Sequence, residues 1–81
     1  MRRIEFNQPV IVVPGRLDRV RIICDVRHAA LVLLREWPRK PTATSNAAMQ
    51  ACLEAMRGQK SAATARAAFL MAAAEARILL N

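Results

Sequence analysis

The chain has 81 residues, of which 54% are hydrophobic, and a formal net charge of +7. A chain of this length buries only about 60–65% of the surface that its unfolded form exposes, so we expect one small domain over residues 1–81 with a thin core. No apolar run approaches the ~20 residues of a membrane span, and no signal-peptide core follows the N-terminus. These features exclude a transmembrane protein and favour a cytoplasmic one.

The positive charge is uneven along the chain. Residues 1–40 hold nine of the 13 basic residues and four of the six acidic ones, and eleven of the basic residues are arginine. Arginine suits bidentate contacts with phosphate or carboxylate, which makes an anionic partner one interpretation. The other is arginine spread over a solvated surface, as in proteins from high-GC genomes, because net charge bears on solubility and non-specific binding rather than on a defined site.

The two cysteines do not form a disulfide framework. Cys24 and Cys52 are far apart, and the chain has no Cys-x-x-Cys pair. Both have apolar neighbours in the sequence, where a free cysteine behaves as a small hydrophobic residue. We therefore expect both thiols to be structural.

Residues 4–24 predict a β-hairpin with its turn at Pro14-Gly15, where proline presets φ and glycine tolerates a positive φ. The residues that we expect to face the core share even parity in both strands, namely Phe6, Val10, Val12, Val20, Ile22 and Cys24. Directly opposed residues lie on the same face of a hairpin, so the two even-numbered sets should oppose each other. This register requires a loop with an odd number of residues.

A first helix is predicted from about Val26 to Glu36, because Asp25 is a suitable N-cap and Pro38 disfavours a helical residue before it. Its apolar positions are spaced i, i+3, i+4, i+7, i+8 and i+11, which is one helical face: Val26, Ala29, Ala30, Leu33, Leu34 and Trp37. We expect Trp37 to be largely buried and to anchor this helix against the other two.

Two further helices follow a loop over residues 38–45. The second is predicted from about Asn46 to Arg57, with Gly58 at the left-handed position after it and Ser61 capping the third. The expected buried positions are Ala48, Met49, Cys52, Leu53, Ala55 and Met56 on the second helix, and Ala65, Phe69, Ala72, Ala76 and Leu79 on the third. The fold class is therefore α+β, an N-terminal antiparallel β-hairpin packed on three α-helices in the order β-β-α-α-α, since an isolated hairpin is marginal in water.

Several of these residues together resemble a known family. They are Trp37-Pro38, then Ala48, Cys52, Ala55 and Gly58, then Ala65-Arg66-x-x-Phe69-x-x-Ala72-Ala73-x-Glu75-Ala76, with a Pro-Val-x-Val hairpin at residues 9–12. The pattern is similar to that of small alpha-proteobacterial proteins of the domain of unknown function 982 family. This resemblance covers nearly the whole chain and implies the fold and a cytoplasmic bacterial setting. It implies no activity.

The sequence predicts no enzyme and no metal, catalytic or cofactor-binding residues. His28 is the only histidine, and although Cys24 lies four residues before it, no nucleophile and base are placed within reach of each other by the pattern. Metal-ligand spacing is absent, and two glycines in all leave no phosphate loop. The third helix presents Ser61, Thr64 and Arg66 among alanines, a poor surface for reading bases.

The odd-numbered face of the hairpin is a candidate interface, because it combines the aliphatic residues Ile11, Val13, Leu17 and Ile23 with Arg19 and Arg21. An apolar centre with an arginine rim is typical of a protein–protein surface, and an exposed hairpin edge can pair with another strand. We assign Ile11, Val13, Leu17, Arg19 and Arg21 to this candidate interface, with a homodimer or another partner protein as its occupant. Alternatively, the aliphatic residues cover the arginine stems or meet a terminal helix.

A second hypothesis is a basic nucleic-acid-binding accessory protein. Its candidate anion-binding residues are Arg2, Arg3, Arg16, Arg19 and Arg21. Binding to phosphate weakens steeply with added salt, whereas an apolar interface is nearly insensitive to it.

Overall fold

The computed structural model of the chain describes residues 4–14 and 19–80. Strands β1 (Glu5–Val12) and β2 (Arg21–Asp25) are followed by α1 (Val26–Leu31), the π-helical continuation η1 (Val32–Glu36), α2 (Ala43–Met56) and α3 (Ala62–Glu75). β1 and β2 are antiparallel neighbours. This order confirms the predicted α+β fold, a hairpin followed by helices.

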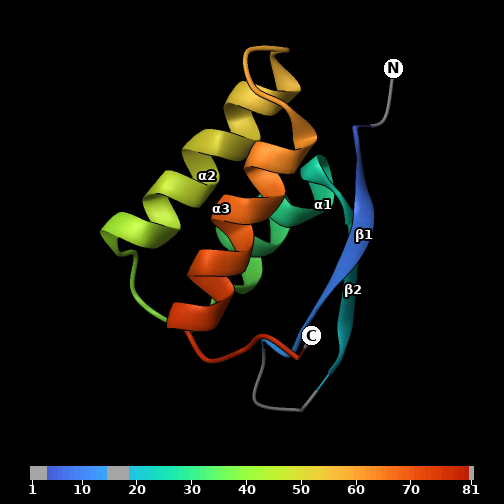
Figure 1. Cartoon of the computed structure of the whole chain (residues 1–81). Coiled ribbons are helices and arrows are strands. Elements are labelled where there is room, and N and C mark those ends of the chain that lie inside the picture. The colour runs from blue at the N-terminus through green and yellow to red at the C-terminus, as the bar shows by residue number, and fades with distance from the viewer. Residues whose placement is uncertain (1–3, 15–18, 81) are drawn as a thin grey trace.

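The helices cover one side of the hairpin. Helix α3 contacts β1, α1 contacts β2, and α2 packs against both α1 and α3. Figure 1 shows the hairpin on one side of the molecule with the three labelled helices all on the other. The molecule is therefore layered as sheet, α1 with α3, and α2, and no helix in the described chain covers the second face of the sheet.

Small side chains fill much of the space between the helices. Phe69 on α3 is the largest fully buried side chain among the described residues, and most of the other fully buried side chains are valine, cysteine and alanine. The predicted core residues of β1, namely Phe6, Val10 and Val12, are all buried, which confirms the first strand. Alanines on both α2 and α3 are buried, so these helix backbones approach closely.

The expectation for the second strand is wrong. Ile23 is the residue of β2 that enters the core, whereas Val20, Ile22 and Cys24 are exposed. Val10 is opposite Ile23 and Val12 is opposite Arg21, so even residues pair with odd ones across an even-numbered loop, residues 13–20.

The physical reason is that β2 carries apolar residues at both parities. Arg21 shares the inner face with Ile23, and this is tolerated because its Nε donates a hydrogen bond to Glu36 Oε1 over 2.9 Å at the end of η1. On β1 the register shifts between Glu5 and Val10, a stretch that contains Pro9. Alternation alone therefore does not select the inner face of β2.

The first helical segment has the predicted bounds but a different buried face. Asp25 is the N-cap and its side chain accepts a hydrogen bond from His28 N, as expected. Val32, the first residue of η1, lies outside the predicted stripe but is fully buried, and η1 packs against α2. Leu34 is 70% exposed, and the prediction that it is buried is wrong.

Trp37 is mostly buried and packs against the core, as expected. Its ring meets that of Phe69 edge to face, with 5.9 Å between centroids and an interplanar angle of 60°. This contact ties the end of η1 to α3. A hollow beside Trp37 leaves part of its side chain open to solvent.

Helix α2 begins earlier than predicted, at Ala43 rather than Asn46. Thr42 and Ser45 form a reciprocal capping box, which the sequence reading placed in the loop. Of the expected core positions of α2, Ala48, Cys52 and Ala55 are buried, Met49 and Leu53 are half-buried, and Met56 is exposed. In α3, Ser61 is the N-cap as predicted, and four residues of the expected stripe, Ala65, Phe69, Ala72 and Ala76, are buried. Leu79 lies beyond the helix, is half-buried and bridges to Val12, so its assignment to the helical stripe is wrong.

Beyond α3 the chain turns back and joins the sheet. Val13 N donates to Ile78 O and Leu80 N donates to Ile11 O, each over 2.8 Å, and Val12 forms an antiparallel bridge with Leu79. Figure 1 shows this C-terminal segment reaching the lower end of β1. Residues 78–80 therefore lie along the edge of β1 opposite β2.

Candidate interaction surface

A row of aliphatic side chains crosses the outer face of the sheet. Ile11 on β1 is directly opposite Ile22 on β2. On its other side Ile11 is bonded to Leu80, whose neighbour Leu79 faces inward opposite the buried Val12. Because successive residues of extended chain point to opposite faces, Leu80 points outward with Ile11 and Ile22.

This row is open to solvent at both ends. Ile22 is 56% exposed and Leu80 is 58% exposed, while Ile11 between them is half-buried. Val20, two residues before Ile22, is 53% exposed and adjoins the row. We refer to Ile11, Val20, Ile22 and Leu80 as the outer sheet patch. Contiguous exposed aliphatic residues of this kind usually mark an interaction site.

The two edges of the sheet differ. Residues 78–80 pair with β1 at Ile11 to Val13, so this edge is occupied there. Strand β2 pairs with β1 only, and no other bridge to β2 occurs within residues 4–14 and 19–80. The hairpin therefore has its open edge at β2.

The residues of the predicted interface lie in different surroundings. Ile11 belongs to the outer face as expected, but Ile23 is a core residue. Val13 is half-buried and lines a hollow at the end of β1. Leu17 lies outside the described residues.

The sequence reasoning missed Val20, Ile22 and Leu80. A signal for Leu80 was present, since the aliphatic run at residues 78–80 directly follows a helix end and is typical of a short strand. For Val20 and Ile22 the sequence offers no comparable signal, because both parities of β2 contain aliphatic residues.

Three of the candidate anion-binding arginines, Arg2, Arg3 and Arg16, lie outside the described residues. Of the other two candidates, Arg19 is exposed and Arg21 is bound through its Nε to Glu36.

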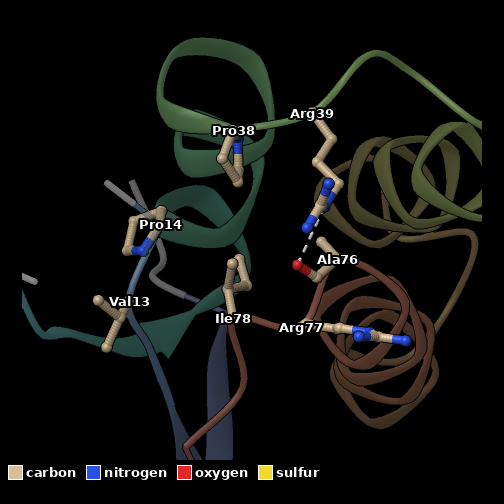
Figure 2. A pocket seen from close by; sticks show the side chains of 7 residues that line it. All are labelled: Val13, Pro14, Pro38, Arg39, Ala76, Arg77 and Ile78. Carbon is tan, nitrogen blue, oxygen red and sulfur yellow. Dashed lines mark hydrogen bonds between the residues drawn. The ribbon is translucent and has the colours of Figure 1, made fainter. Parts of the chain in front are cut away.

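A hollow of about 480 Å³ lies where the end of β1, the loop after η1 and the end of α3 meet. Arg39 Nε donates to Ala76 O over 3.2 Å, and Figure 2 shows this side chain reaching across from the loop to the last turn of α3. In the same view Arg77 points away from the rings of Pro14 and Pro38. Arg39 is thus held by a helix C-terminus, and its guanidinium acts as a cap there.

A second hollow, of about 390 Å³, lies between η1, the loop at residues 37–41 and the start of α2. Leu34, Trp37 and Met49 form its apolar wall, and Arg39 borders it as well as the first hollow. It explains the exposure of Leu34. Ser45 also lines it and is buried, but its hydroxyl is already hydrogen-bonded to Thr42.

The residues with reactive groups are dispersed. Cys24 is exposed on the outer side of β2, so its expected structural role is wrong, whereas Cys52 is buried in α2 as expected. Burial raises the pKa of the Cys52 thiol to about 11, which keeps it protonated near neutral pH. His28 is half-buried in the first turn of α1. In the part of the chain that the structure describes, no three His, Cys, Asp or Glu side chains are grouped to hold a metal ion.

Comparison with protein families gives one match. The family model of proteins of unknown function named DUF982 matches residues 8–80, from the bulged stretch of β1 to the C-terminal segment. The chain belongs to the domain of unknown function 982 family. Comparison with curated proteins and with solved structures found no match.

The match to the domain of unknown function 982 family includes every residue of the outer sheet patch. It carries no activity with it, so function has to be argued from the surface itself. None of the described helices has the length and apolar character needed to cross a bilayer.

Proposed function

We propose that this protein is a non-enzymatic interaction protein that self-associates through its β-hairpin. The observation that carries the proposal is the open β2 side of the hairpin, where Ile22 is 56% exposed and the strand edge has no second strand neighbour within residues 4–14 and 19–80. A two-fold axis allows the same surface of two copies to meet, so a second copy is the simplest occupant.

The charges around β2 support a second copy over an unrelated partner. Arg21 and Asp25 stand at the two ends of β2, so the strand carries one charge of each sign. An antiparallel copy reverses this order and sets unlike charges against each other. A cytoplasmic location is part of the proposal, and it is supported by the exposed free thiol of Cys24, which suits a reducing compartment.

Sedimentation velocity over a range of concentrations tests the proposal. The wild type is expected to form a dimer, and Ile22→Lys is expected to shift it to monomer, because a charge on the patch would have to be desolvated in the contact. Leu34→Lys is the matched control, since Leu34 is 70% exposed on η1, away from the sheet. A wild type that is monomeric at the highest concentration contradicts the proposal.

The same preparation separates the alternative, a nucleic-acid-binding protein. A monomer that retains short DNA or RNA at low salt would favour binding through Arg2, Arg3, Arg16, Arg19 and Arg21. Retention that is lost steeply with added salt would identify phosphate contacts.

A further inference from the structure

We infer that two copies pair edge to edge through β2, with the two-fold axis beside Ile23. This inference rests on the proposed self-association and specifies its geometry. It would join the two hairpins into one continuous sheet with β2 of both copies at the centre. Three features decide the pairing: which edge is open, which register pairs it, and what that register does to the exposed residues.

The open edge is β2. Residues 78–80 occupy the edge of β1, whereas β2 has β1 as its one strand neighbour in the described chain. Natural edge strands are protected by proline, lysine, a bulge, shortness or inward-pointing charges. β2 has neither proline nor lysine, and the register irregularity lies in the part of β1 away from Val10 to Val12. Its inward-facing charge, Arg21, is matched by Glu36, so it does not bar a partner strand.

Symmetry limits the register. Two antiparallel edge strands are related by a two-fold axis perpendicular to the sheet, so each residue faces a partner residue on the same face, and one residue faces its own copy. An axis beside Ile23, the middle of β2, pairs all five residues of Arg21–Asp25. It places Arg21 of each copy directly opposite Asp25 of the other, twice in the dimer.

The neighbouring registers lack this complementarity. An axis beside Ile22 sets Arg21 opposite Ile23 of the other copy, and an axis beside Cys24 sets Asp25 opposite Ile23. Each places a charge against an aliphatic side chain on the inner face and leaves an end of β2 unpaired. Unlike charges directly opposite each other stabilise a strand pair, so the axis beside Ile23 is favoured. Asp25 keeps its helix-capping bond to His28 N, since a carboxylate accepts several hydrogen bonds. Arg21 keeps its Nε bond to Glu36, since the Nη groups of its guanidinium carry further N–H donors.

On the outer face this register places Ile22 of each copy against Cys24 of the other. That contact covers the side of Ile22 that faces the open edge. Leu80 lies two segments away from the axis, beyond β1, and stays uncovered. Edge pairing therefore leaves Leu80 exposed to solvent, whereas face-to-face packing of two outer sheet patches would bury it.

Cysteine cross-linking reads the register directly. In the Ile22→Cys variant, the new thiol faces Cys24 of the other copy at the ~4.5–5.5 Å Cα separation of opposed residues, within the range that a disulfide bridges. Mild oxidation should give a covalent dimer in about tenfold greater yield than in the wild type. The peptide map should show a disulfide between the introduced thiol at position 22 of one copy and Cys24 of the other.

Val20→Cys is the matched control on the same face. With the axis beside Ile23 its thiol is displaced diagonally from Cys24 of the other copy, so the yield should stay near that of the wild type. Efficient cross-linking of Val20→Cys would instead place the axis beside Ile22, and a wild-type Cys24–Cys24 disulfide would place it beside Cys24. Either result overturns the inferred register.

Leu80→Lys separates failure of this inference from failure of the proposed function. Edge pairing predicts that its sedimentation matches the wild type. A wild-type dimer that Leu80→Lys dissociates, with no cross-link in Ile22→Cys, would mean that the faces pack together, so the proposed self-association stands and the edge pairing is wrong. A wild type that remains monomeric removes both.

Discussion

Arg77 has a left-handed backbone, with φ of 59°, at a position where glycine is favoured. Ile78 N donates to Ala73 O and Arg77 N donates to Ala74 O, which is the hydrogen-bond pattern of a Schellman motif after α3. Helix α2 ends in the same motif, but there Gly58 holds the left-handed position with φ of 80°, as its sequence position predicts. The two helix ends thus differ in one residue type at equivalent positions.

Arg77→Gly is therefore expected to stabilise the fold. The change removes about 1–2 kcal/mol of strain, because a residue with a Cβ is disfavoured in the left-handed region. It also destabilises the fold by about 0.4–1 kcal/mol, because glycine makes the unfolded chain more flexible. The net result is a rise of roughly 0.5–1 kcal/mol in the free energy of unfolding. Urea unfolding followed by circular dichroism measures it. Ala76→Gly is the control, because Ala76 has an ordinary helical backbone and should lose stability instead. Equal losses in both variants would contradict the strain argument.

The two thiols should differ sharply in reactivity. Cys24 is exposed, while Cys52 is buried and its pKa is raised to about 11 by desolvation. At pH 8 a thiol reagent should modify Cys24 in the folded protein and reach Cys52 only on unfolding, since the thiolate is the reactive form. Rapid native labelling of Cys52 in a Cys24→Ser background would contradict its burial.

Cys52 also sets an alkaline dependence of stability. Its pKa in the fold lies above the ordinary value of 9.0, so the unfolded chain loses the proton first as pH rises. The stability that the buried, protonated thiol contributes is fully present below pH 9. It is lost between pH 9 and pH 11, where the free energy of unfolding falls by up to about 1.4 kcal/mol per pH unit. The difference in stability between wild type and Cys52→Ala should shrink over this window.

At the scale of elements, Thr42 connects two helix ends. Its Oγ1 accepts from Ser45 N over 3.1 Å, and Ser45 Oγ accepts from Thr42 N over 2.8 Å, which closes the capping box of α2. The Thr42 hydroxyl also donates to Glu75 Oε1 at the end of α3, over 2.6 Å. Hydrogen bonds from Thr42 and then Thr44 lower the pKa of Glu75.

Thr42→Ala is expected to cost about 1 kcal/mol through loss of the N-cap, while Thr42→Ser should retain most of the stability. Thr42→Ala should also raise the pKa of Glu75 towards its ordinary value, because the hydrogen bond from the threonine hydroxyl is lost. An NMR titration measures this pKa. Because the pKa of Glu75 is lowered in the fold, its contribution is present above the ordinary pKa and is lost as pH falls through the folded value. An unchanged Glu75 titration in Thr42→Ala would mean that this hydrogen bond does not form in solution.

The elements that the sequence predicts well are those with a strong local signal. Asp25, Ser61 and Gly58 mark helix boundaries through their own side chain or backbone, and all three are confirmed. The start of α2 was missed because Thr42 and Ser45 form a capping box without the usual Glu or Gln at its third position. Local side-chain and backbone signals thus predicted most helix boundaries. They missed the start of α2, where serine takes the place of the usual Glu or Gln in the capping box.

The inner face of β2 could not be predicted from alternation. Ile22 and Ile23 are equally apolar neighbours, and the choice between them depends on the register with β1 and on Arg21 reaching Glu36 fifteen residues later in the chain. Whether Ile22 or Ile23 faces the core also determines which residues form the outer sheet patch. Which residues of the hairpin face solvent therefore depends on long-range contacts that alternation does not reveal.

At the scale of the whole molecule, the sheet is completed by the two ends of the chain. Ile11 and Leu80 are bonded across nearly the full length of the sequence, so the edge of β1 is closed only when α3 is in place. That closure leaves β2 as the open edge and adds Leu80 to the exposed aliphatic row. The candidate surface is thus a product of tertiary structure, although each of its residues is an ordinary strand-forming one.

The effect of added salt should distinguish self-association from phosphate binding. The net charge of +7 repels a second copy of the protein but attracts phosphate groups. Two copies repel each other, and added salt screens this repulsion while weakening the exposed Arg21 to Asp25 pairs between copies only modestly. The dimer constant from sedimentation should therefore change little between 50 and 500 mM salt, by roughly threefold or less. If several arginines bind phosphate, the logarithm of the binding constant would fall with the logarithm of the salt concentration, with a slope of about −0.9 per neutralised phosphate. A dimer that dissociates as steeply as that would mean that charge, not the outer sheet patch and the β2 backbone, holds the copies together.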